Sequence, residues 1–463
     1  MSFPSEVPPE ITDAIIDELR DDSIALAHCS LVSYQFLARS QTYLYARITI
    51  EFDRQGYLQP HPVQRFLQVL TPHLARCIHH LTLLNYVEQD WNSSLDGTAS
   101  DCGDQFLAVL FRQVGRLNSF TLIVAPYGGA FGNGRLSDSL KSVIYTMIQD
   151  TRVSELTIDN TIDFPTIFLA FDCTYLRKLS FHQRLGSLRS VGEQDAVIIP
   201  SHAEAQDIGH LDSLEFDDAS VINIEGLYSN MKLSRSRLTL SYLRELSVLG
   251  HEPSTVSLVA KIVSDTWIML ECLNWDYDQS YRYTDFRSES MALAFPPNPI
   301  SLRLAFPHDS HKAEPTHLNW LLNGLQRTSR SSRRLEELVI VLNFGYSPSD
   351  NTTPDLWSEC DVWAPAFDAL LSGPQYPHLR RVSVFIDCDP PDDGHDLAVS
   401  YFANEAEQFR RKLPMLRDSG KLSVQWMMLV GYPIWPLSFA LRAMKRGIEG
   451  GIIVDEEGEF VVE

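Results

Sequence analysis

The chain has no paired cysteines. Its seven cysteines stand singly, at positions 29, 77, 102, 173, 272, 360 and 388, so neither a C-x-x-C metal motif nor a disulfide framework is indicated. The first residues have no basic region and no apolar core, and no apolar run approaches the length needed to cross a bilayer. We therefore expect reduced thiols and a location in the cytoplasm or the nucleus.

Basic residues are scarce relative to acidic ones. The 463 residues include 38 Lys and Arg against 60 Asp and Glu, which gives a formal net charge of −22. Nucleic-acid binding depends on basic side chains that neutralise phosphates, and anionic membrane surfaces attract the same side chains. The charge therefore argues against nucleic acid and against a membrane as partners. It identifies no partner, because net charge governs mainly solubility and association.

Signatures of catalysis and of metal binding are also missing. The sequence has no G-x-S-x-G and no H-E-x-x-H motif. Glycines spaced like those of a phosphate loop occur at 129–134, but Arg135 and Leu136 follow where that loop needs a lysine and a hydroxyl. The acidic segment 387–396 contains two prolines that break the frame of a calcium loop. We expect no enzyme activity, no cofactor and no metal site.

One basic cluster occurs in the chain. It consists of Arg327, Arg330, Arg333 and Arg334, interleaved with serine and threonine. Such a cluster can receive an acidic or phosphorylated segment of a partner. The alternative interpretation is a solvated loop before the strand that follows Leu335.

Three short helices are predicted for residues 8–44. Prolines at the start suit a first helical turn, where a missing N–H is not needed. The first helix carries apolar residues at three- and four-residue steps: Ile11, Ala14, Ile15 and Leu19. Asp21 and Asp22 break this helix and offer carboxylates that cap a second one. A corner at 29–31 and a third helix from about Val32 to Leu44 complete the prediction.

The same stretch resembles an F-box, in the form common at the start of fungal leucine-rich-repeat proteins. The F-box pattern opens with Leu-Pro-x-Glu-Ile, and this chain has Val7-Pro8-Pro9-Glu10-Ile11. The paired aliphatic residues of the first F-box helix match Ile15-Ile16, followed by Leu19, and the later hydrophobic–Val–Ser step and aromatic match Leu31-Val32-Ser33 and Phe36. Val7 and Phe36 depart from the usual Leu and Trp. The resemblance covers residues 6–46.

A second pattern recurs along the rest of the chain: an aliphatic residue, two others, an aliphatic residue, one other, and a third apolar residue. Clear copies begin at Ile78, Leu117, Val153, Leu176, Leu211, Leu243, Leu270, Leu335 and Leu379, with a poor copy at 300–304 and a partial one at 422–424. The second half of each copy alternates as a strand does. Helix-like stretches lie between copies, at 63–77, 105–114, 138–149, 255–269, 315–327, 362–371 and 398–413. Repeated helix and strand predict a solenoid.

The L-x-x-L-x-L core of each copy resembles a leucine-rich repeat. The Asn or Cys that usually follows the strand is not found at a fixed offset, and the spacing is uneven, so the repeats are irregular. A generic α/β domain with parallel strands is the competing interpretation, and both make the fold class α/β. Polar segments interrupt the array at 87–103, 186–210, 276–299, 344–360 and 387–397, where recognition surfaces often lie.

Three parts are expected along the chain. They are an N-terminal three-helix F-box-like module (1–46), an irregular leucine-rich-repeat array (47–430), and a C-terminal cap with an acidic tail (431–463). Within the tail, 452–454 and 461–462 either add a last strand or fray.

The F-box resemblance implies a function in ubiquitination. The module would dock on the Skp-type adaptor of a cullin–RING (SCF-type) ubiquitin ligase, and the repeats would hold an unidentified substrate protein. The resemblance assigns adaptor binding to Pro8, Ile11, Ile15, Leu19, Leu31, Val32 and Phe36. The alternative is a non-catalytic repeat scaffold whose front helices serve only as an end cap. A cap turns its apolar face inward, whereas a docking module leaves several of these residues exposed.

Overall fold

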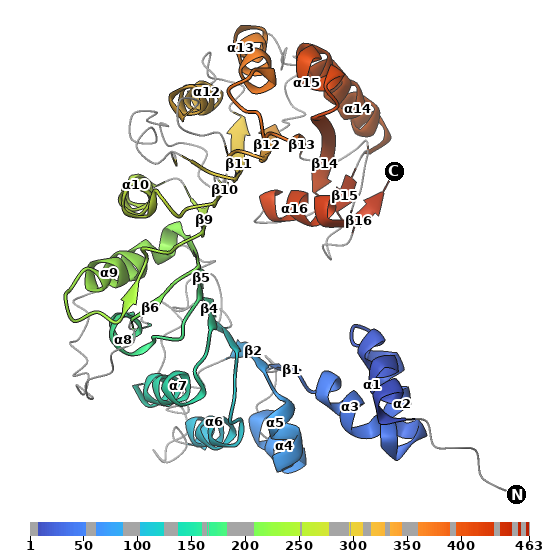
Figure 1. Cartoon of the computed structure of the whole chain (residues 1–463), viewed down its shortest axis with the longest axis vertical. Helices are drawn as coiled ribbons and strands as arrows, with labels where there is room; N and C mark the ends of the chain where they lie inside the picture. Colours follow the sequence, from blue (N-terminus) through green and yellow to red (C-terminus); the bar gives the residue numbers. More distant parts are fainter. Residues whose placement is uncertain are drawn as a thin grey trace, which may run out of the picture. The chain divides into compact units, whose positions relative to one another are not determined.

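The computed structural model is a mixed α/β protein built on parallel strands (Figure 1). It describes residues 8–51, 62–86, 102–124, 138–159, 164, 166–182, 208–250, 252–276, 296, 298–308, 316–328, 334–344, 360–388, 395–429, 436–446, 452–454 and 460–462. The chain divides into two compact units. Unit 1 comprises Met1–Leu211 and Ile222–Thr239, and unit 2 comprises Asp212–Val221 and Leu240–Glu463.

Unit 1 begins with three short helices, as predicted. They are α1 (Pro9–Glu18), α2 (Ser23–Val32) and α3 (Tyr34–Leu44). Asp22 caps α2 as expected, because its carboxylate accepts a hydrogen bond from the Ala25 N–H at 2.9 Å. The predicted corner at 29–31 is wrong, since α2 continues through it. The break falls at Ser33, whose extended backbone and side-chain hydroxyl, which accepts from the Gln35 N–H at 3.3 Å, start α3.

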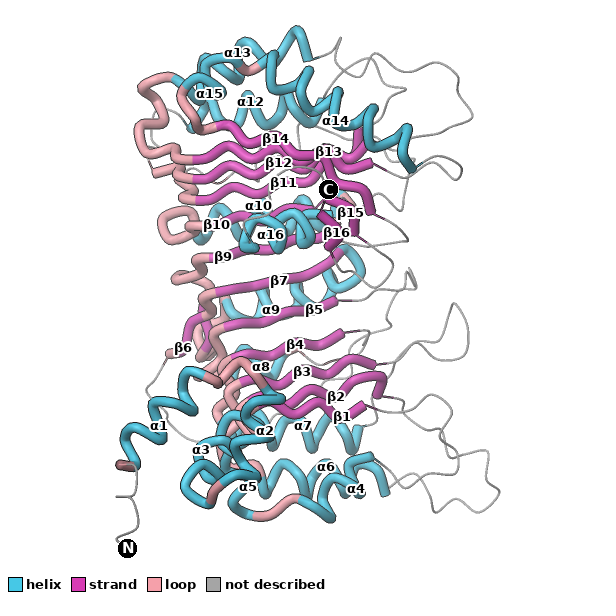
Figure 2. Tube along the Cα trace, turned by 90° about the vertical axis from the view of Figure 1, so that its right-hand side faces the viewer, coloured by secondary structure: helices cyan, strands magenta, loops and turns pink. Residues whose placement is uncertain are grey.

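The rest of unit 1 is a parallel sheet with helices. The strands, in spatial order, are β1 (Arg47–Glu51), β2 (His80–Tyr86), β3 (Ser119–Val124), β4 (Glu155–Asp159) and β5 (Lys178–His182). The helices are α4 (Pro62–Val69), α5 (Pro72–Cys77), α6 (Cys102–Gln113), α7 (Asp138–Thr151), α8 (Ile167–Asp172) and α9 (Val221–Met231). A separate pair is formed by β6 (Gly209–His210) and β8 (Leu238–Thr239). Figure 2 shows β1 to β5 side by side.

Unit 2 repeats this arrangement. Its parallel strands, in spatial order, are β7 (Ser213–Asp217), β9 (Glu245–Leu249), β10 (Cys272–Asp276), β11 (Ser301–His308), β12 (Glu337–Phe344), β13 (Arg381–Cys388), β14 (Leu422–Leu429) and β15 (Ile452–Val454). The last strand, β16 (Phe460–Val462), is antiparallel to β15, so the tail forms two strands. The helices are α10 (Pro253–Thr266), α12 (Thr316–Thr328), α13 (Cys360–Ser372), α14 (His395–Lys412), α15 (Pro414–Asp418) and α16 (Pro436–Arg446).

The sequence repeat is also a structural repeat. The second aliphatic residue of each copy pairs with its equivalent in the next strand: Leu81, Phe120, Leu156 and Leu179 in unit 1, and Leu214, Leu246, Leu273, Leu302, Leu338, Val382 and Leu422 in unit 2. All of these except Leu422 are buried. A slip by one residue would expose the whole apolar set, which fixes the register.

A backbone motif precedes most strands. One carbonyl of each copy accepts two N–H groups from the next copy: the Ser154 oxygen, for example, accepts from Arg177 at 2.8 Å and from Lys178 at 2.9 Å. In unit 2, the Glu271 oxygen accepts from Ile300 at 2.7 Å and from Ser301 at 3.0 Å. The turn before each strand is therefore held without a specific side chain, which accommodates the irregular sequence of the copies.

The poor copy at 300–304 has a structural explanation. Leu302 pairs with Leu273 and Leu338, so the first aliphatic position of this copy falls on Pro299. Pro299 is buried, while Ile300 is only half-buried. The copy is regular in space, with a proline in place of the first leucine.

The predicted helices are present, with one correction. Residues 63–77 form two helices, because Thr71 precedes Pro72 and adopts an extended backbone. The Thr71 hydroxyl accepts from the Leu74 N–H at 3.3 Å and caps α5. The interrupting segments lie largely outside the described residues.

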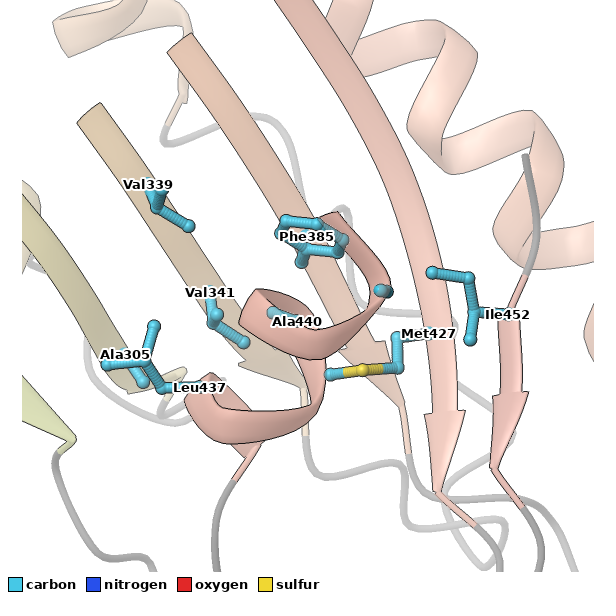
Figure 3. Close-up of a cluster of buried hydrophobic side chains, with 9 residues drawn as sticks. Ala305, Val339, Val341, Phe385, Met427, Leu437, Ala440 and Ile452 are labelled. Carbon is cyan, nitrogen blue, oxygen red and sulfur yellow. The ribbon is translucent and has the colours of Figure 1, made fainter. Parts of the chain in front are cut away.

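A helix that the sequence patterns did not predict covers one face of the sheet in unit 2. Figure 3 shows α16 lying across the strands, with Leu437 beside Ala305 and Ala440 beside Val341 and Phe385. The buried cluster consists of Ala305, Val339, Val341, Phe385, Met427, Leu437, Ala440, Ala443 and Ile452. At its N-terminus, the Leu437 N–H donates to the Asp276 carboxylate at 3.1 Å. Strands β11 to β14 are therefore covered by α16 on the face opposite α12 and α13 (Figure 1).

Candidate docking surface of the N-terminal helices

The three N-terminal helices share a small core. Ile16 of α1 and Leu26 of α2 are buried, together with the polar residues Thr12 and Ser40. Helix α3 contacts α1, α2 and α5, so it joins the other two helices to the rest of unit 1. So few buried side chains stabilise a module of this size only weakly. The apolar residues that remain outside this core are therefore of functional interest.

A polar network fixes α1 against α3. The Asp17 carboxylate accepts from Arg39 Nε at 2.7 Å, from Arg39 Nη2 at 2.9 Å and from the Tyr43 hydroxyl at 2.8 Å. These donors, Arg39 first, lower the pKa of Asp17 below its usual value. The same bonds to the carboxylate raise the pKa of Arg39 and that of Tyr43. The network thus holds α1 in one orientation on α3.

This network makes the folding of the module depend on pH. A carboxyl group whose folded-state pKa is lowered stabilises above its unfolded pKa, here 3.8, and loses this effect as pH falls through the folded value. We expect Asp17→Asn to lower the thermal midpoint at neutral pH, and the difference from wild type to narrow as the pH falls below 3.8. Circular dichroism melts measure both. Glu18→Gln, one residue further on, is the control, and a gap that stays constant with pH would contradict the prediction.

Most of the predicted adaptor-binding residues lie on the surface. Pro8 is exposed, and the exposed fractions of Ile11, Ile15, Leu31 and Val32 are 53%, 46%, 85% and 76%. Leu19 and Phe36 are half-buried within the module. The structure therefore brings five of the seven onto the exposed sides of α1 and α2, and places the other two where they also support the helices.

Two further residues extend this surface. Ile24 of α2 is 70% exposed and Tyr34, at the start of α3, is 88% exposed. The sequence signal for Ile24 was the composition of α2, which contains no Asp, Glu, Lys or Arg between Ser23 and Val32. A helix that is apolar on all sides is normally buried on all sides. We define the docking surface as Pro8, Ile11, Ile15, Ile24, Leu31, Val32 and Tyr34.

The other candidate sites have less structural support. The phosphate-loop-like segment 129–136 lies outside the described residues, as do Arg330 and Arg333 of the basic cluster. Arg334 lies near the Glu271 carboxylate, at 3.9 Å. Asp387, in the acidic segment, lies in β13 and is buried. Within the described ranges, no group of three or more His, Cys, Asp or Glu is arranged to hold a metal ion.

Comparisons with known proteins add no identification. No protein-family model matches the sequence, and no curated protein is detectably similar to it. In the part of the chain that the structure describes, none of the helices has the length and apolar character to cross a membrane.

Proposed function

We propose that this chain is the substrate-recognition subunit of a cullin–RING (SCF-type) ubiquitin ligase. The observation that supports it is the docking surface, on which Ile11, Leu31 and Val32 are each more than half exposed. Several large apolar side chains that are exposed on consecutive short helices are typical of protein–protein contacts. The F-box-like pattern then suggests a Skp-type adaptor as the partner.

In this proposal the helix–strand copies form an irregular leucine-rich-repeat array that holds the substrate protein. The in-register pairing of equivalent residues in β2 to β5, and in β7 to β14, is consistent with stacked repeats. The chain itself would carry out no chemistry. Transfer of ubiquitin would depend on the rest of the ligase, in the cytoplasm or the nucleus.

The alternative proposal is a repeat scaffold in which the N-terminal helices are an end cap. The packing of α3 on α5 favours a capping role for that helix. It does not account for α1 and α2, whose apolar residues Ile15, Ile24 and Leu31 point away from the core. A cap needs polar residues on its outer side. Capping by α3 and docking by α1 and α2 are compatible.

Co-purification with a Skp-type adaptor tests the proposal. The full chain is expected to capture the purified adaptor, and a double variant, Ile15→Asp with Leu31→Asp, is expected to lose capture at least about 100-fold, because two charges would be buried in an apolar contact. Both positions are exposed in the free chain, so the variant should fold normally. Circular dichroism checks this point.

A matched control lies in unit 2. Ile268 is 64% exposed, just beyond α10, and Ile268→Asp should leave capture unchanged. Failure of the folded wild-type chain to capture the adaptor would refute the proposal and favour the scaffold alternative. Equal loss in all variants would show that the capture is non-specific.

A further inference from the structure

A histidine lies in the middle of the apolar side of α2. At 100° per residue, Ile24, His28, Leu31 and Val32 fall within roughly 100° of arc on one side of the helix, opposite the buried Leu26. His28 is exposed, and it is preceded by Ile24 one turn back and followed by Val32 one turn on. Whatever covers these three apolar residues must also cover the imidazole between them.

Several of the charged groups around α2 have partners other than His28. The titratable groups of α1, of the turn before α2 and of α3 are Glu10, Asp13, Asp17, Glu18, Arg20, Asp21, Asp22, Tyr34, Arg39 and Tyr43. Asp17, Arg39 and Tyr43 bind one another, Asp22 caps α2, and Asp21 pairs with Arg20. Within the described residues, His28 makes no hydrogen bond or ion pair with any of them.

We infer that docking on this surface is sensitive to pH through His28, and that acid weakens it. This inference rests on the proposed function. Covering Ile24, Leu31 and Val32 with an apolar partner surface removes water from the imidazole as well. A neutral imidazole tolerates that loss of water far better than an imidazolium ion does. Histidine is the side chain whose charge ordinarily changes near neutral pH, so a modest fall in pH is enough to alter docking.

The size of the effect follows from proton linkage. If only the neutral form docks, affinity falls by up to about tenfold for each unit of pH over the range in which the imidazole takes up its proton. The opposite sign would require a carboxylate of the partner beside His28. The direction of the pH effect therefore also reports on the chemistry of the partner's surface.

The experiment measures the affinity of the purified full chain for a purified Skp-type adaptor at pH 7.5 and pH 5.5. His28→Gln and His28→Ala serve as variants that cannot gain a proton at this position. We expect wild type to lose affinity at pH 5.5, by up to about tenfold for each unit of pH, and both variants to bind equally at the two pH values. Circular dichroism at both pH values establishes that each chain remains folded.

The outcomes separate the two proposals. Wild-type binding that is constant or stronger at pH 5.5 overturns the role of His28, as does a loss that both variants share, since that loss would arise from other groups. In either case the docking function itself stands. Absence of binding at pH 7.5 refutes the docking function, and the inference falls with it.

Discussion

Replacing Gly250 with alanine should destabilise unit 2 by about 3 kcal/mol. Gly250 has a φ of +145°, a region that side-chain-bearing residues rarely adopt. An added Cβ would also overlap the Asp218 carboxylate, which cannot easily move. That carboxylate accepts from the Glu252 N–H at 3.2 Å and from the Thr255 hydroxyl, and so holds the start of α10.

Two other glycines supply the controls. Gly420 has a φ of +71° with open space around it. Gly420→Ala should therefore lower the free energy of unfolding only through backbone strain, by about 1 kcal/mol. Gly115, in unit 1, has neither a positive φ nor a neighbour, and Gly115→Ala should be near neutral in circular dichroism melts, which follow both units. Urea unfolding followed by tryptophan fluorescence reports chiefly on unit 2, which holds seven of the eight tryptophans. If Gly250→Ala and Gly420→Ala lost equal amounts of unfolding free energy, the overlap with Asp218 would be contradicted.

Replacing Ala440 with aspartate should remove α16 from the sheet, at a cost of at least about 3 kcal/mol. Ala440 is fully buried against the apolar strands, where nothing compensates a carboxylate. Release of the helix exposes Val339, Val341 and Phe385, so a dye that binds apolar surfaces should bind the variant in native buffer. Urea unfolding gives the free energy.

Lys445→Asp is the matched control on the same helix. Lys445 is exposed, so the substitution buries no charge and alters only the interaction with the helix C-terminus, which is worth less than about 1 kcal/mol. Equal effects of the two variants would show that α16 does not depend on its contact with the sheet.

The strands and most of the helices were predictable, because both follow from local periodicity. Leu246-Ser247-Val248 alternates and forms β9, and similar triplets mark the other strands. Helix α16 was not predicted, although the sequence of a strand beneath it indicates that this strand is covered on both faces. The run Leu338 to Leu342 is apolar without alternation, and a strand that is apolar on both sides needs cover on both.

The candidate site was predictable only in part. The F-box-like pattern treats Ile15 and Ile16 as a pair, yet Ile16 is fully buried and Ile15 is 46% exposed. Neighbouring helical residues point about 100° apart, so which of them faces the core depends on where α3 packs. That packing is fixed by the contact between Asp17 and Arg39. These two residues lie 22 positions apart in the chain, so no local sequence pattern reveals their contact.

Helix α16 has a consequence for how this chain can diversify. Val339, Val341 and Phe385 support a helix, so variation there is constrained by packing. Ser247 and Asn274, on the same side of the neighbouring strands β9 and β10, are half-buried and do not belong to the cluster beneath α16; the Asn274 amide donates a hydrogen bond to the Ser247 hydroxyl at 2.9 Å. Chains that descend from a common ancestor with this one should therefore keep apolar residues beneath α16 and differ at β9 and β10. New binding specificities would arise on the part of the sheet that α16 leaves uncovered.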